Sequence, residues 1–210
     1  MKLAWPVHAM LRSAALPLLF CASAAISFVV SSPGGGYSQR GPVPRQSDRF
    51  SNVRLITQHG QQVRFYDDLV KDRTVVINLM YSGCGEVCPA NSAQLARLNE
   101  LLGERMGRDI TMLSISIDPV ADTPERLKHY WAAFGAKPGW LFLTGNPAEI
   151  DKLRRELGAY DLDRTVDADP TQHAGYAMIG NDAANRWIVV PLLMSMPQLV
   201  GSILRVAARD

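Results

Sequence analysis

The feature that most constrains the fold of this 210-residue chain is a pair of cysteines, Cys84 and Cys88, at the junction of two sequence patterns. Residues 75–81 form a short apolar run rich in β-branched side chains, which is typical of a buried strand. Pro89 follows the pair, and proline suits the first turn of a helix, where a missing N–H costs nothing. We therefore expect both thiols at a strand-to-helix turn, where backbone N–H groups and the helix dipole favour the thiolate.

Thiolates bind soft metals and attack disulfides, so the pair predicts a metal-binding or redox site. A structural disulfide is one alternative, because helical spacing sets the Cα atoms about 6 Å apart. So short a loop, however, constrains the unfolded chain little. Structural zinc is a second alternative, but zinc takes four ligands, commonly from two cysteine pairs. No second pair exists, since the only other cysteine is Cys21, which lies in an apolar N-terminal run.

The N-terminal residues indicate export from the cytoplasm. Lys2 and Arg12 precede an uncharged run over residues 14–30, which is at the short limit for a membrane-spanning helix and longer than the usual core of a signal peptide. Basic residues on the N-terminal side predict that side inside and the domain outside. We expect residues 1–32 to be a membrane anchor or signal segment that places the domain on the extracytoplasmic, periplasmic side. Cleavage near the small residues 22–24 is the alternative, and it releases the domain into the same compartment.

The remaining chain divides into a linker and one folded domain. Residues 33–51 are rich in Gly, Pro, Ser, Arg and Gln, which predicts a flexible linker, and residues 52–210 have the length of a single domain. In an oxidising compartment, the two thiols of that domain indicate a redox or metal function. The net charge of +2 comes from interspersed charges without a basic stripe, so we exclude nucleic acid as a partner.

Sequence patterns predict an α/β fold with a mixed sheet and an N-terminal β-hairpin. The expected strands are residues 52–57 and 61–65 (the hairpin), 75–81, 110–117, 140–144, 175–179 and 186–190. The expected helices are residues 89–106, 122–134, 147–157 and 196–207. Asp122 is expected to cap the second helix, while His59 and His129 are expected in a turn and on a helix surface. Open α/β sheets bind ligands at the carboxyl ends of their strands, where the cysteine turn lies.

Four motifs in this order resemble the Sco/SenC family, membrane-tethered thioredoxin-like proteins that carry copper for the assembly of cytochrome c oxidase. They are Cys84-x-x-x-Cys88-Pro89, residues 115–119 (Ile-Ser-Ile-Asp-Pro) followed by Asp122-Thr123-Pro124, residues 142–145 (Phe-Leu-Thr-Gly), and a late histidine, His173. The similarity extends over residues 52–206 and implies a thioredoxin-like domain.

The resemblance implies that Cys84, Cys88 and His173 bind copper together. Two thiolates and one imidazole suit Cu(I), and with a further weak ligand they hold Cu(II). Asp118 follows the strand that should neighbour the cysteine strand, so we expect it either to orient a ligand or partner or to serve as a turn residue before Pro119. The implied partners are the copper-site subunit of cytochrome c oxidase or another copper carrier, together with the membrane.

The leading hypothesis is therefore a metallochaperone that delivers copper to a cytochrome oxidase copper site. The alternative is a thiol–disulfide oxidoreductase that reduces cysteines of a partner, with Cys84 and Cys88 as the redox-active pair. Three residues separate these cysteines, whereas two are usual in the dithiol of a thioredoxin-like oxidoreductase. The longer spacing suits a metal chelate better. A peroxidase is a third hypothesis, because residues 78–85 faintly resemble glutathione peroxidases, but their Gln and Trp-Asn-Phe motifs are absent.

The chain departs from the family pattern in two places. Gly83 and Gly85 flank Cys84 where many relatives carry larger residues, which predicts a more flexible turn. Residues 161–172 are rich in Asp and contain Pro170, which predicts an irregular approach to His173. Both differences bear on ligand geometry and hence on copper affinity.

Overall fold

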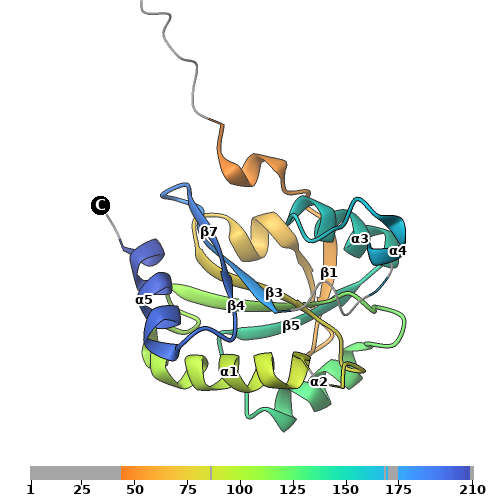
Figure 1. Cartoon of the computed structure of the whole chain (residues 1–210), viewed down its shortest axis with the longest axis horizontal. Helices are drawn as coiled ribbons and strands as arrows, with labels where there is room; N and C mark the ends of the chain where they lie inside the picture. The colour runs from red at the N-terminus through yellow and green to blue at the C-terminus, as the bar shows by residue number, and fades with distance from the viewer. Residues whose placement is uncertain (1–43, 86, 168, 170–174, 209–210) are drawn as a thin grey trace, which may run out of the picture. The chain divides into compact units, whose positions relative to one another are not determined.

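The computed structural model describes residues 44–85, 87–167, 169 and 175–208. Within these residues, seven strands form one sheet in the order β2-β1-β5-β4-β3-β6-β7 (Figure 1). The strands are β1 (Arg54–Thr57), β2 (Gln62–Arg64), β3 (Thr74–Met80), β4 (Ile110–Ser116), β5 (Trp140–Gly145), β6 (Tyr176–Asn181) and β7 (Arg186–Pro191). β4 pairs in parallel with β3 and β5, whereas all other pairings are antiparallel. The predicted α/β class, mixed sheet and N-terminal hairpin are confirmed.

The helices include counterparts of the four predicted ones, together with shorter segments that the sequence patterns did not indicate as separate helices. They are η1 (Gln46–Arg49), η2 (Phe65–Val70), α1 (Val87–Leu102), η3 (Gly103–Arg105), α2 (Pro124–Ala133), α3 (Pro147–Glu156), α4 (Arg164–Asp167) and α5 (Met196–Ala207). The prediction of one helix over residues 89–106 is wrong at both ends. Gly103 has a φ of 49°, a left-handed conformation that glycine adopts readily, and the α-helix ends there.

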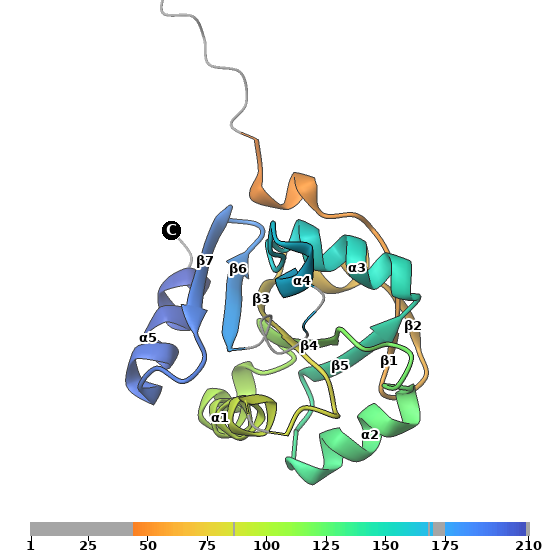
Figure 2. The same ribbon diagram turned by 45° about the vertical axis from the view of Figure 1, so that its right-hand side comes forward.

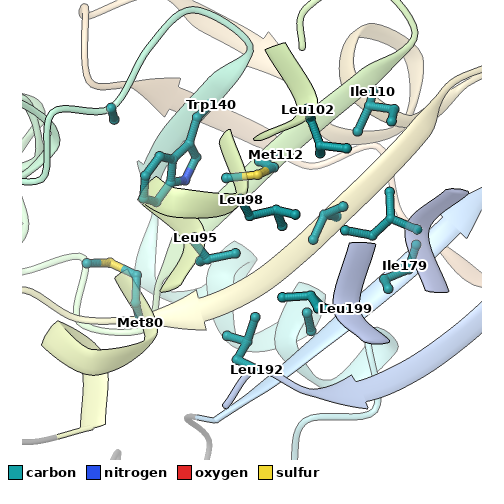
Figure 3. Packing of buried hydrophobic residues seen from close by; sticks show 14 of the residues in the cluster. Met80, Leu95, Leu98, Leu102, Ile110, Met112, Trp140, Ile179, Leu192 and Leu199 are labelled. Carbon is teal, nitrogen blue, oxygen red and sulfur yellow. The ribbon is translucent and has the colours of Figure 1, made fainter. Parts of the chain in front are cut away.

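Apolar side chains fill both faces of the sheet, because successive residues of a strand point to opposite sides. In β3, Val76 and Met80 belong to one buried cluster, and Ile77 and Leu79 belong to the other. Figure 2 shows α1 and α2 on one side of the sheet and α3 and α4 on the other. Figure 3 shows the first of these clusters, the cluster beneath α1. This cluster includes Met80, Leu95, Leu98, Met112, Trp140 and Leu199.

The C-terminal ends of β3 and β4 lie side by side at the same end of the sheet. Met80 and Ser116, the last residues of the two strands, are paired in register, and the N–H of Ile117 donates to the carbonyl of Met80 at 2.9 Å. The turn into α1 and the segment that leads to α2 therefore leave the sheet together. This arrangement brings the cysteine motif next to the motif that contains Asp118 and Asp122.

The structured region extends into the range 33–51 that the sequence predicts as linker. Ser47 and Phe50 are buried, and the Phe50 ring contacts Trp187 with 5.2 Å between ring centroids. The predicted anchor over residues 1–32 and the linker up to residue 43 lie outside the described residues. In the part of the chain that the structure describes, no helix combines the length and hydropathy needed to cross a membrane.

Candidate metal and thiol site

Cys84 and Cys88 lie where β3 leads into α1, as predicted. Their exposed fractions are 9% and 1%, and neither cysteine is in a disulfide. The backbone N–H of Cys88 donates to Sγ of Cys84 at 3.2 Å, so the turn folds back and brings the two residues into contact. Two reduced sulfur ligands in one buried turn are a donor set that fits a soft metal ion.

The thiol of Cys88 differs from the sequence-based expectation. Burial raises the pKa of Cys88 to about 12, and the hydrogen bond with Cys84 acts in the same direction. The prediction that the turn favours the thiolate is therefore wrong for Cys88, because desolvation outweighs the N-terminal end of α1. Any metal ion that binds Cys88 has to displace its proton.

Two tyrosines lie beside the thiols, and sequence reasoning identified neither. Burial raises the pKa of Tyr81, and so do the neighbouring thiol of Cys84 and a hydrogen bond to it. Burial also raises the pKa of Tyr130, whose hydroxyl lies 3.0 Å from that of Ser92 on α1. Tyr81 was detectable as the residue that leaves the strand just before the turn. Tyr130 was not, because only a long-range contact between α2 and α1, through its hydroxyl and that of Ser92, brings it close.

Asp122 lies beneath the cysteine turn and does not cap α2. Its side chain is fully buried, and it accepts hydrogen bonds from the N–H of Ser82 at 3.0 Å, from the Ser82 hydroxyl and from the Ser116 hydroxyl at 2.6 Å. The cap is Thr123, whose side chain accepts the N–H of Arg126 at 3.3 Å. The prediction of Asp122 as the cap is wrong because its carboxylate faces the ends of β3 and β4.

Asp118 has the contacts of a turn residue. Its carboxylate accepts the N–H of Ala121 at 3.3 Å, and its own N–H donates to the Ser116 hydroxyl at 3.1 Å. A role for Asp118 in orienting a ligand stays a prediction. His59 and His129 are exposed, as expected for a turn and a helix surface.

His173 lies outside the described residues, so its approach to the two sulfurs stays a prediction. The same holds for the irregular approach expected over residues 161–172, of which only the part up to residue 167 and residue 169 are described. Among the described residues, no three side chains of His, Cys, Asp or Glu gather closely enough to hold a metal ion. A site with a third protein ligand of these types therefore needs a residue from outside that set.

The two glycines that flank Cys84 are not required by the backbone. Neither is among the glycines with positive φ, and a Cβ at Gly85 would meet no atom within 4 Å. We expect Gly85→Ala to raise the free energy of unfolding by about 0.4–1 kcal/mol, because alanine narrows the unfolded ensemble without native strain. Urea denaturation of the reduced protein measures this change.

Gly139→Ala is the matched control for this prediction. Gly139 has a φ of 90°, and a Cβ there would lie 2.3 Å from the backbone nitrogen of Gly107. We expect this control to lose stability, because neither backbone can give way easily. A comparable loss in Gly85→Ala would contradict the prediction and show that the cysteine turn itself needs glycine.

A family model described as SCO1/SenC matches residues 44–200. Protein SenC of Rhodobacter capsulatus is 34% identical over 137 residues, which are 58% of this chain and 60% of that protein. The chain thus spans less than two thirds of this relative's length.

Solved structures share the fold. The structure of Bradyrhizobium japonicum ScoI with copper bound has a TM-score of 0.58 and 22% identity, and the match covers 75% of this chain and 99% of ScoI. The structure of BsSco, a member of the Sco family of cytochrome c oxidase assembly proteins in which a disulfide switch was identified, has a TM-score of 0.57 and 18% identity. That match covers 75% of this chain and 94% of BsSco. These likenesses confirm the predicted thioredoxin-like arrangement.

Proposed function

The chain belongs to the SCO1/SenC family, and on that premise we propose that it binds copper through Cys84, Cys88 and His173 and delivers it to a cytochrome oxidase copper site. The observation that carries the proposal is the cysteine turn, where two buried, reduced residues meet through a 3.2 Å contact between the N–H of Cys88 and Sγ of Cys84. The copper bound to ScoI and the oxidase-assembly role of the family of BsSco support it.

The residues divide the work of holding a copper cargo. Cys84 and Cys88 supply two soft donors from one turn, and His173 supplies an imidazole from a separate part of the chain. Burial of both sulfurs limits the access of water and of competing thiols. The copper ion then leaves by ligand exchange with the cysteines or histidines of a partner that docks at this end of the sheet. A domain held on the extracytoplasmic side by residues 1–32 meets such a partner at the membrane.

The second candidate function is thiol–disulfide exchange by the same cysteines. It is favoured by their contact in the reduced state, which prepares the pair for a disulfide, and by the disulfide switch of BsSco. The high pKa of Cys88 argues against Cys88 as the attacking group, because the thiolate is the nucleophile. In this function Cys84, the more exposed of the two, is the residue that attacks.

His173→Ala separates the two functions. Loss of an imidazole ligand should lower Cu(I) affinity at least about tenfold, the lower end of what loss of a mere supporting contact costs at metal sites. Both thiols remain, so oxidation to the Cys84–Cys88 disulfide should persist. Competition with a Cu(I) chelator and thiol titration measure the two properties on the same reduced preparation.

His129→Ala is the matched control, because His129 is an exposed histidine of α2. It should leave both measurements unchanged. Wild-type copper affinity in His173→Ala would remove His173 from the site. Cells that assemble active oxidase normally at limiting copper with His173→Ala, but fail with either cysteine variant, would favour the oxidoreductase.

A further inference from the structure

We propose that Asp122 is a positioning residue for the cysteine pair. Its buried carboxylate holds the cysteine turn in place through Ser82. The proposal rests on the proposed function for its copper consequence, but its consequence for thiol chemistry is independent of copper. Nothing in the sequence pattern assigns this role, since the pattern around Asp122 is that of a helix start.

The contacts of Asp122 are made from three separate elements. Ser82 belongs to the cysteine turn, Ser116 ends β4, and Arg126 belongs to α2, whose cap Asp122 directly precedes. Arg126 of α2 closes the group toward solvent, with its Nε 2.6 Å from the Ser82 hydroxyl and 3.7 Å from Oδ1 of Asp122. A buried carboxylate is costly unless it is hydrogen-bonded, and hydrogen bonds to a charged acceptor are the stronger ones.

The geometry of the contact with Ser82 fixes the backbone and not only a side chain. Oδ2 of Asp122 accepts the Ser82 N–H at 3.0 Å, and Oδ1 accepts the Ser82 hydroxyl. One residue is thereby held at two points by one rigid carboxylate. On the same turn, the N–H of Cys84 donates to the carbonyl of Tyr81, the residue before Ser82, at 3.3 Å. Loss of the carboxylate therefore frees the segment that presents Cys84 to Cys88.

Asp182 offers a matched control within the same chain. It is also fully buried, and its carboxylate accepts hydrogen bonds from the Ser47 hydroxyl and, at 2.9 Å, from the N–H of Asp72. It also forms an ion pair with Arg45 at 3.0 Å. Its own N–H donates to the carbonyl of Arg73 at 3.0 Å, just before β3 begins. Asp182 thus has similar chemistry at the end of β3 that lies opposite the thiols.

The test compares Asp122→Asn with Asp182→Asn in equilibrium with glutathione. In this reaction the Cys84–Cys88 disulfide and two glutathione thiols give two cysteine thiols and one glutathione disulfide. Both variants are expected to lose stability, but only Asp122→Asn should shift the equilibrium toward the dithiol, by at least about tenfold, because loosely held thiols close the disulfide less readily. Asp182→Asn should stay within about twofold of wild type. Equal shifts in the two variants, or none in Asp122→Asn, would overturn the proposal.

A milder pair covers the case in which Asp122→Asn fails to fold. Ser82→Ala and Ser47→Ala each remove one serine hydroxyl that donates a hydrogen bond to a buried aspartate. Only Ser82→Ala should shift the glutathione equilibrium. Cu(I) competition provides the second reading, with weaker binding expected in Asp122→Asn and Ser82→Ala alone. If wild-type protein binds no Cu(I), the proposed function fails, while the glutathione measurement still decides the role of Asp122.

Discussion

Replacing Cys88 with serine is expected to abolish copper binding and the intramolecular disulfide in the same protein. A serine hydroxyl is not a soft donor and forms no sulfur–sulfur bond. Cys88 is 1% exposed within the cluster beneath α1, so the variant should also lose stability, because burying the more polar hydroxyl costs more than burying a thiol. Copper content after reconstitution, thiol titration and urea denaturation check the three effects.

Cys84→Ser should lose the same two properties, and Cys21→Ser should lose neither, because it leaves both thiols of the turn in place. Oxidation of the wild-type pair should release copper as well, since a disulfide sulfur carries no thiolate charge. Stoichiometric copper in Cys88→Ser, or in protein without titratable thiols, would show that the metal is held elsewhere.

Local patterns predict most of the fold because each pattern depends on neighbours in sequence. The bounds of α5, residues 196–207, are as expected, and all seven residues of β3 are buried. The first long helix is the exception. Its leucine periodicity continues past residue 102, but the spacing of apolar residues does not reveal that Gly103 takes a left-handed conformation and ends the α-helix.

The site is less predictable, because its properties arise between elements. Asp122 and Thr123 both fit the cap position before Pro124, and only the contact with Ser82, forty residues earlier, decides between them. The start of α1 favours a thiolate at Cys88, but the helices packed around it remove water, and no local pattern reports that. A place for His173 next to the sulfurs stays a prediction, because it depends on a long-range contact of the same kind.

Copper affinity is expected to rise steeply with pH, by about tenfold per unit from the Cys88 proton alone. The pKa of Cys88 is raised to about 12, so the thiol is protonated in the metal-free protein at every ordinary pH. Below that pKa, each rise of one pH unit therefore increases the thiolate fraction about tenfold, and the copper affinity rises with it. Competition with a Cu(I) chelator over about pH 6 to 9, corrected for protonation of the chelator, measures the slope.

Folding stability supplies an independent check of the same proton. An acid whose pKa is raised by folding stabilises the native state below its unfolded pKa, about 8.5 for a thiol, and loses that contribution as pH rises toward the folded value. The free energy of unfolding of the reduced, metal-free protein should thus fall above about pH 8.5, and Cys88→Ser should remove that part of the decline. An affinity that stops rising near neutral pH, with no Cys88-dependent decline in stability, would mean that the start of α1 holds Cys88 as a thiolate after all.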